Sequence, residues 1–146
     1  MTCYTVENIC LIINNRLVWN VEFHDDFASE FEDLSEEVQD ELLATAKLLE
    51  TFGSQLKRPH ADTLNGSQYT NMKELRFNAN GGVWRVAFAF DPTRQAILLV
   101  AGNKSGVGQK RFYKELIKKA DARYKSHLLN LGEDSRGNGE KFERQN

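Results

Sequence analysis

The chain has 146 residues, a length that suits one domain with one hydrophobic core. Apolar residues make up 40% of the sequence and charged residues 27%, which is the balance of a folded protein rather than of a disordered segment. No apolar run approaches the ~20 residues that a membrane helix needs, and none suits a signal-peptide core, so we expect a cytoplasmic protein. The two cysteines, Cys3 and Cys10, are too close together to predict a disulfide framework or a zinc site.

Charge is unevenly distributed along the chain, although the net charge is only −2. Residues 24–50 include ten acids and one lysine, whereas residues 51–111 include nine bases and three acids. A basic surface attracts polyanions whatever the net charge, because the local field steers a phosphate backbone. Charge runs are often only solvated surface, so the positions of the bases must decide between these two interpretations.

The organised pattern covers only part of the chain. Residues 1–17 have no clear period and predict an N-terminal extension. Residues 132–146 are polar and contain almost no apolar side chains, so they predict a disordered C-terminal tail. We therefore expect the folded domain to occupy residues 18–131.

The domain is predicted to begin with a strand and two helices. Residues 19–23 alternate in polarity, as a strand does. Asp25 or Asp26 can cap a short helix, and Ser35 can cap a longer one that Gly53 ends. The two helices predict a hairpin that is acidic outside and apolar within.

A run of strands is expected next. Residues 53–71 have a loop composition, after which residues 72–77 and 83–90 form a hairpin across a glycine-containing turn. The apolar segment 96–101 predicts a strand that is buried on both faces. Because the turns are short, we expect an antiparallel meander.

A final helix follows a glycine-rich stretch and is expected to end at Gly132. Its apolar residues share one stripe: Phe112, Leu116, Ala120, Tyr124 and Leu128. The predicted fold class is therefore α+β, with an N-terminal helical hairpin packed on a twisted antiparallel sheet and a C-terminal helix.

Strand alternation predicts where basic side chains meet. Arg76 and Arg85 both point away from the apolar positions of their strands, so they should emerge on the same face of the sheet. Lys104 follows the next strand, and Tyr113 lies at the start of the last helix. We expect these four residues to converge on one concave surface. Further candidate contacts for RNA are Lys57, Arg58, Lys73, Lys110 and Arg111.

Such a cluster suits RNA cleavage without a metal. When a 2′-hydroxyl attacks the adjacent phosphate, fixed guanidinium and ammonium groups stabilise the added negative charge. A tyrosine hydroxyl, or a lysine with a lowered pKa, can take part in proton transfer. The alternative is structural: Arg76 and Arg85 could pair with acids such as Glu74, and Tyr113 could be an ordinary core aromatic.

Other sites are less well supported. The segment 102–105 (GNKS) lacks the glycine that a Walker A motif has directly before its lysine, which excludes a nucleotide triphosphatase. The histidines, His24, His60 and His127, have no metal-ligand spacing, so we expect neither a metal nor a cofactor. Only His60, in a basic loop, is a further candidate for catalysis.

Four segments in order resemble the phage-related branch of the RelE/HigB toxins. They are 71–77 (NMKELRF), 84–91 (WRVAFAFD), 97–106 (ILLVAGNKSG) and 111–113 (RFY). The ordered series is more specific than any one segment, and the resemblance extends over residues 19–131. It implies the same α+β fold. It also implies an endoribonuclease that cleaves messenger RNA, usually on the ribosome, and is neutralised by a neighbouring antitoxin, a HigA-like helix-turn-helix protein.

By position, the resemblance implies catalytic roles for Arg76, Arg85 and Lys104, and for either Tyr113 or Phe112 as the C-terminal aromatic. The chain departs from the RelE pattern at Glu74, where RelE is richer in lysine. This departure leaves the proton-transfer assignments open. A member of the family could also bind RNA or the ribosome without cutting, and a phage-assembly role would involve no toxicity.

Overall fold

The computed structural model describes residues 19–136, with side chains described for residues 19–132. The predicted extension 1–17 lies outside the described residues, as do residues 137–146 of the predicted tail. The elements in order are β1 (Asn20–Phe23), α2 (Asp25–Glu32), α3 (Glu36–Phe52), η1 (Gly53–Gln55), β2 (Ala61–Thr63), β3 (Met72–Ala79), β4 (Gly82–Phe90), β5 (Gln95–Asn103) and α4 (Gln109–Arg136).

The strands form one five-stranded sheet with the order β1-β5-β4-β3-β2. Strands β3, β4 and β5 are antiparallel, as predicted, and β2, which was not predicted, is antiparallel to β3. Strand β1 runs parallel to β5, with Asn20 opposite Gln95. The α+β fold class is thus confirmed, and the sheet is mixed rather than wholly antiparallel. The parallel pair is possible because α2, α3 and the later strands provide a long connection between β1 and β5.

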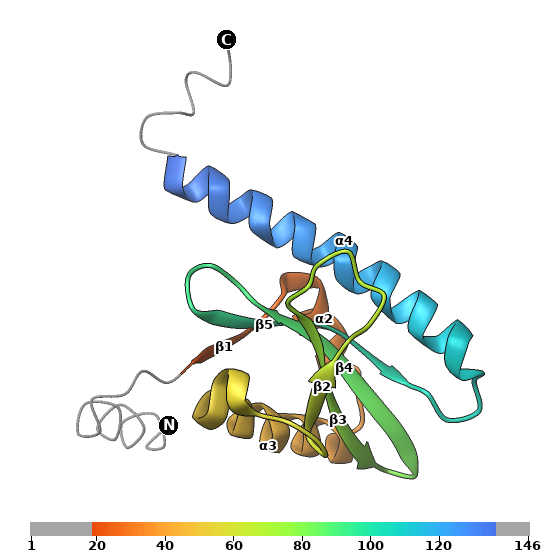
Figure 1. The fold of residues 1–146 in the computed structure, drawn as a ribbon. Helices are drawn as coiled ribbons and strands as arrows, with labels where there is room; N and C mark the ends of the chain where they lie inside the picture. The colour runs from red at the N-terminus through yellow and green to blue at the C-terminus, as the bar shows by residue number, and fades with distance from the viewer. Residues whose placement is uncertain (1–18, 137–146) are drawn as a thin grey trace.

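Helices cover both faces of the sheet (Figure 1). The hairpin of α2 and α3 buries one cluster, which includes Phe27, Leu42, Leu75 and Phe88. The long helix α4 buries the other cluster with Met72, Ala87, Leu99, Phe112 and Tyr124. The sheet therefore separates an acidic helical layer from the layer that contains α4.

Local capping fixes the ends of the hairpin helices. The Ser35 hydroxyl accepts a hydrogen bond from the Val38 backbone N–H at 3.3 Å, as the sequence predicts. Gly53 ends α3 with a φ of 54°, and a Cβ there would lie 2.1 Å from the Trp19 ring, so no other residue fits. The α2 cap differs from the prediction, because His24 Nδ1 accepts the Asp26 N–H, and the two aspartates lie in the first turn.

Two predicted boundaries were wrong. Strand β2 lies inside the predicted loop 53–71, where it pairs with β3; three residues are too few to show a period. Helix α4 continues through Gly132 to Arg136. A glycine lowers helix propensity by only about 1 kcal/mol, so it does not end a helix by itself.

Three polar residues of α4, Asp121, Arg123 and His127, link the helix to the rest of the molecule. The Ser67 hydroxyl donates to Asp121 at 2.5 Å, and His127 Nε2 lies 2.7 Å from Asp91 Oδ2. Arg123 pairs with Glu30 of α2 and also donates to the Leu99 carbonyl oxygen at 2.7 Å. These contacts fix α4 along much of its length, so the side chains at its start have a defined position over the sheet.

Candidate active site

Strand register brings the two predicted arginines together. Arg76 of β3 lies directly opposite Arg85 of β4. Their strand neighbours Leu75 and Val86 belong to the cluster under the hairpin, so both arginines face the α4 side of the sheet. The predicted alternation is confirmed for both strands.

Glu74 lies between the two arginines. The residue as a whole is 3% exposed, and its Oε2 accepts a hydrogen bond from Arg76 at 2.6 Å. Oε1 lies 4.0 Å from Arg85 Nε. Like charges placed directly opposite each other on neighbouring strands are destabilising, and the Glu74 carboxylate offsets that repulsion.

Arg85 is more buried than the sequence suggests. Although it points to the predicted face, it is only 6% exposed, because α4 covers this part of the sheet. Its Nε donates to the Tyr113 hydroxyl at 3.2 Å, and its Nη1 donates to the Trp84 carbonyl oxygen at 2.9 Å. The guanidinium is therefore fixed in orientation.

The two candidate aromatics at the start of α4 have different surroundings. Phe112 is 8% exposed and packs on Gly102, where a Cβ would lie 2.8 Å from its ring. Tyr113 is partly exposed, and its hydroxyl contacts Arg85. Burial raises the pKa of Tyr113; the Arg85 hydrogen bond opposes this, and the Glu74 carboxylate adds to it. Of these two aromatics, Tyr113 is the one that brings a hydroxyl to Arg85.

Lys104 lies beside this group, directly after β5. Its Nζ is 5.8 Å from the centroid of the Tyr113 ring. Partial burial lowers the pKa of Lys104, and the positive charges of Arg85 and Arg76 lower it further. Lys104 therefore loses its proton more readily than an isolated lysine does.

An open groove of about 1040 Å³ runs between β3, the loop after β2 and the start of α4. We call it the basic groove. Six cations line it together with Tyr113 and Glu74: Arg58, Arg76, Lys104, Lys110, Lys114 and Lys118. Asp62 also lines the groove and pairs with Arg58 at 2.8 Å. The groove is thus predominantly positive on the α4 side.

Sequence reasoning missed two of these cations, Lys114 and Lys118. With Lys110 they recur every four residues, so they share one side of α4. The same helical period that predicts the apolar stripe of α4 would have found them.

Three predicted RNA contacts lie outside the basic groove. Lys73 shares the strand face of Leu75 and therefore points to the hairpin side, which strand alternation alone could have predicted. Arg111 lines a separate hollow of about 220 Å³ along α4. Lys57 is exposed in the loop after η1 and lines neither space. The structure does not bring these three residues to the arginines.

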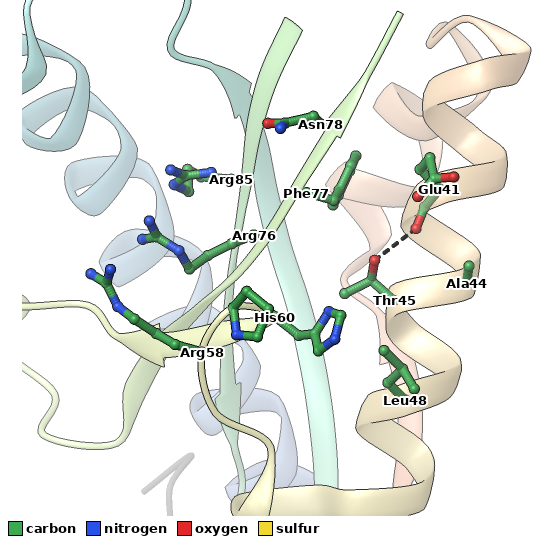
Figure 2. Close-up of a pocket in the computed structure, with 11 residues that line it drawn as sticks. Glu41, Ala44, Thr45, Leu48, Arg58, His60, Arg76, Phe77, Asn78 and Arg85 are labelled. Atoms are coloured by element: carbon green, nitrogen blue, oxygen red, sulfur yellow. Dashed lines mark hydrogen bonds between the residues drawn. The ribbon is translucent and has the colours of Figure 1, made fainter.

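A second pocket, of about 730 Å³, lies between α3 and the edge of β3. Figure 2 shows Arg58, Arg76 and Arg85 in a row on the side away from α3, whereas His60 lies nearer that helix. The His60 carbonyl oxygen accepts the Arg76 N–H at 2.8 Å. His60 therefore neighbours the arginines through its backbone, and it does not line the basic groove.

Within the described part of the chain, no group of three or more histidine, cysteine, aspartate or glutamate residues could hold a metal ion. No helix in that same part is long and apolar enough to cross a membrane.

Comparison with known proteins identifies the family of this chain. Residues 29–125 match the family described as phage-derived protein Gp49-like (DUF891). The match covers more than half of the chain, which therefore belongs to this family.

Two similar relatives are from Mycobacterium tuberculosis. The chain is 45% identical over 96 residues to "Putative toxin HigB2", an alignment that covers 65% of this chain and 47% of the relative. It is 49% identical over 81 residues to "Putative toxin HigB3", covering 56% of this chain and 68% of the relative. The chain thus spans about half the length of HigB2. No solved structure matches this chain. The resemblance to the HigB-like branch is confirmed.

Proposed function

We propose that this protein is the toxin of a type II toxin–antitoxin system. In this proposal it is a metal-independent endoribonuclease that cleaves messenger RNA on the ribosome, in the cytoplasm. The observation that carries the proposal is the contact of 3.2 Å between Arg85 Nε and the Tyr113 hydroxyl, beside Arg76 and Lys104. The names of the two toxin relatives support the same class.

The proposed reaction is an internal transesterification. The 2′-oxygen attacks the phosphorus, the bond from phosphorus to the 5′-oxygen breaks, and the products are a 2′,3′-cyclic phosphate and a 5′-hydroxyl. Arg76 and Lys104 neutralise the charge that develops on the phosphoryl oxygens. Arg85, which is buried beside them, adds positive charge and donates a hydrogen bond to the Tyr113 hydroxyl.

Two protons must move in this reaction. The 2′-hydroxyl loses one, and the leaving 5′-oxygen gains one. The raised pKa of Tyr113 keeps its hydroxyl protonated, which suits it to donate to the leaving oxygen. The lowered pKa of Lys104 suits it to accept the 2′-proton when its amine is neutral.

The lysines of α4 are proposed to bind the RNA strand on one side of the reacting phosphate. Lys110, Lys114 and Lys118 line the basic groove at successive turns of the helix. Such a row contacts phosphates without reading the bases. Arg58 extends the same cationic surface on the other wall.

Inducing the chain without its partner tests the function. The expected result is growth arrest with truncated transcripts, whose new ends are a 2′,3′-cyclic phosphate and a 5′-hydroxyl. Products with a 3′-hydroxyl and a 5′-phosphate would exclude the mechanism. The mechanism would also be excluded if a metal chelator abolished cleavage while the ribosomes remained assembled.

A second candidate function is RNA or ribosome binding without cleavage. The burial of Arg85 and the pairing of Arg76 with Glu74 favour it, because both guanidiniums already have protein partners. Growth arrest with intact transcripts would support this alternative.

The proposed partner is a HigA-like helix-turn-helix antitoxin. It either covers the basic groove or docks on the acidic hairpin, whose exposed carboxylates include Glu36, Glu37 and Asp40. Co-expression should yield a stable complex. If the chain is expressed alone at a high level and growth is not inhibited, the toxin assignment is contradicted.

A further inference from the structure

Glu74 combines deep burial with incomplete hydrogen bonding. Its side chain is 4% exposed, in the middle of β3. Oε2 accepts the hydrogen bond from Arg76, whereas Oε1 has no hydrogen-bond partner among the described residues. A buried carboxylate oxygen without a donor is unfavourable for folding. Packing therefore does not account for a glutamate at this position.

We propose that Glu74 is a positioning residue, which aligns Arg76 and Arg85 as one anion-binding pair and orients the hydroxyl of Tyr113. The inference rests on the proposed ribonuclease function and adds a residue to it.

The electrostatics of the strand pair favour a carboxylate at this position. Arg76 and Arg85 are opposite each other across β3 and β4, where two positive charges repel. Glu74 lies two positions before Arg76 on the same face and reaches both guanidiniums, at 2.6 Å and 4.0 Å. One carboxylate between two guanidiniums leaves a net positive charge for a phosphate. It also fixes the guanidiniums before the phosphate arrives.

Glu74 also affects the proton of the Tyr113 hydroxyl. Arg85 Nε donates to the Tyr113 oxygen, so the hydroxyl is the acceptor in that bond and its own proton is free for another acceptor. Glu74 Oε1 is the nearby buried acceptor without a donor. Among the causes that raise the pKa of Tyr113, burial is the largest, and the Glu74 carboxylate acts in the same direction. Glu74 thereby favours the protonated hydroxyl.

Glu74 acts through its neighbours rather than on the substrate. Its free oxygen is buried, and its other oxygen is occupied by Arg76. A general base has to reach the proton that it removes, directly or through one water. In this geometry the groups that reach a bound phosphate are Arg76, Lys104 and Tyr113, which line the groove with side chains more exposed than Glu74.

The test compares Glu74→Gln in the full chain with Glu115→Gln, which removes an exposed carboxylate from the far side of α4. With RNA on ribosomes, Glu74→Gln should lower kcat about 10- to 100-fold and change KM little, by analogy with the residues that hydrogen-bond to metal ligands and orient them. The alkaline limb of the rate should move to lower pH, since the Tyr113 pKa falls without the carboxylate. Glu74→Asp should recover part of the rate, and Glu115→Gln should match the wild type.

A second measurement is independent of cleavage. Tyrosinate absorbance is titrated in the wild type and in Glu74→Gln, and the Tyr113 signal is isolated by subtracting Tyr113→Phe in each background. A lower Tyr113 pKa in Glu74→Gln supports the inference even if the wild type does not cut RNA, a result that would reject only the proposed function. An unchanged Tyr113 titration overturns the inference.

Two further outcomes also overturn it. One is an unchanged cleavage rate in Glu74→Gln. The other is a loss of rate that follows only the unfolded fraction, with the pH profile unmoved, because that result makes Glu74 a purely structural residue. If Glu74→Gln does not fold, the same comparisons are made with Glu74→Asp, which keeps the charge but retracts it by one methylene. A wild-type rate, pH limb and Tyr113 titration in Glu74→Asp then overturn the inference.

Discussion

Arg85 lies below the surface of the basic groove, where its guanidinium donates to Tyr113 and to the Trp84 carbonyl oxygen. A charge held in this way is already oriented before any ligand binds, and preorganised charges are the ones that stabilise a transition state most. The same hydrogen bonds make the side chain part of the folded structure. Arg85 therefore contributes both to stability and to the proposed chemistry.

Arg85→Ala is expected to lower the cleavage rate by about 10²–10³, equivalent to about 2.7–4 kcal/mol by analogy with an oxyanion donor. Sequence alternation alone predicts that folding survives, because the side chain points away from the hairpin core. The burial of Arg85 instead predicts a loss of about 1–3 kcal/mol in unfolding free energy, since Glu74 and Tyr113 lose a partner. Thermal unfolding and single-turnover rates measure the two effects, and wild-type values for both would contradict the site.

Tyr113→Phe separates proton transfer from packing, because it removes only the hydroxyl. We expect a large loss of rate with little change in melting temperature. Tyr124→Phe is a matched control: its hydroxyl donates to the Phe90 carbonyl oxygen at 3.2 Å, away from the groove, so the change should affect stability but not rate. Equal rates for the two variants would assign Tyr113 to packing.

At the scale of single elements, α4 presents two stripes with different tasks. Phe112, Leu116, Ala120 and Tyr124 are buried against the sheet. The lysines Lys110, Lys114 and Lys118 line the groove beside them. One helix therefore both completes a core and supplies three of the six cations that line the basic groove.

Replacing each groove lysine of α4 by glutamine should weaken binding of single-stranded RNA. For every RNA phosphate that is no longer neutralised by a lysine, the slope of log affinity against log salt should decrease by about 0.7. Lys125→Gln, on an exposed part of the same helix, is the control and should leave the slope unchanged. Titrations at several salt concentrations give the slopes, and an equal decrease for all four variants would mean that the groove has no special role.

The far half of α4 is linked to the sheet by Asp91. Burial alone would raise the pKa of Asp91, but hydrogen bonds from His127, Gln95 and Thr93 outweigh it and lower the pKa below the ordinary 3.8. A carboxyl group whose pKa is lower in the folded state than in the unfolded state stabilises the fold at pH values above its unfolded-state pKa. This stabilisation is lost as the pH falls through the folded-state pKa. The melting temperature should therefore decrease when the pH is lowered below about 4.

Asp91→Asn should remove this part of the acid dependence. At neutral pH it should also cost about 1–3 kcal/mol of unfolding free energy, because a buried acceptor is removed. Melting curves between acidic and neutral pH test both effects, with Asp40→Asn on the exposed side of α3 as the control. An acid dependence in Asp91→Asn equal to that of the wild type would reject the assignment.

Sequence patterns predict much of this structure, because they record which side chains avoid water. The alternation of apolar and polar residues along β3 and β4 correctly predicted that Arg76 and Arg85 share one face of the sheet. Capping residues predicted the ends of α3. Patterns do not record pairing partners. The parallel pairing of β1 with β5, and the approach of Glu74 to Arg85, depend on register and on neighbouring strands, which no local period reveals.

At the scale of the whole molecule, two hydrophobic clusters share one sheet, and both lie within the described residues 19–136. A chain trimmed to residues 18–136 should therefore unfold cooperatively and, if the proposed function is correct, arrest growth as the full chain does. The cut is placed after Arg136 rather than at the predicted domain end, residue 131, because α4 continues that far. Thermal unfolding and growth arrest are the measurements, and loss of cooperativity would show that the residues removed contribute to the core.

The separation of acidic and basic layers by the sheet gives the molecule an electric dipole. Exposed carboxylates such as Glu36, Glu37 and Asp40 lie on one side, and the lysines of α4 lie on the other. In the field of a polyanion, such a dipole experiences a torque that turns the positive end inward before the two molecules meet. The fraction of encounters with the correct orientation rises accordingly, within about 10 Å at 0.1 M ionic strength and over a shorter range as salt increases.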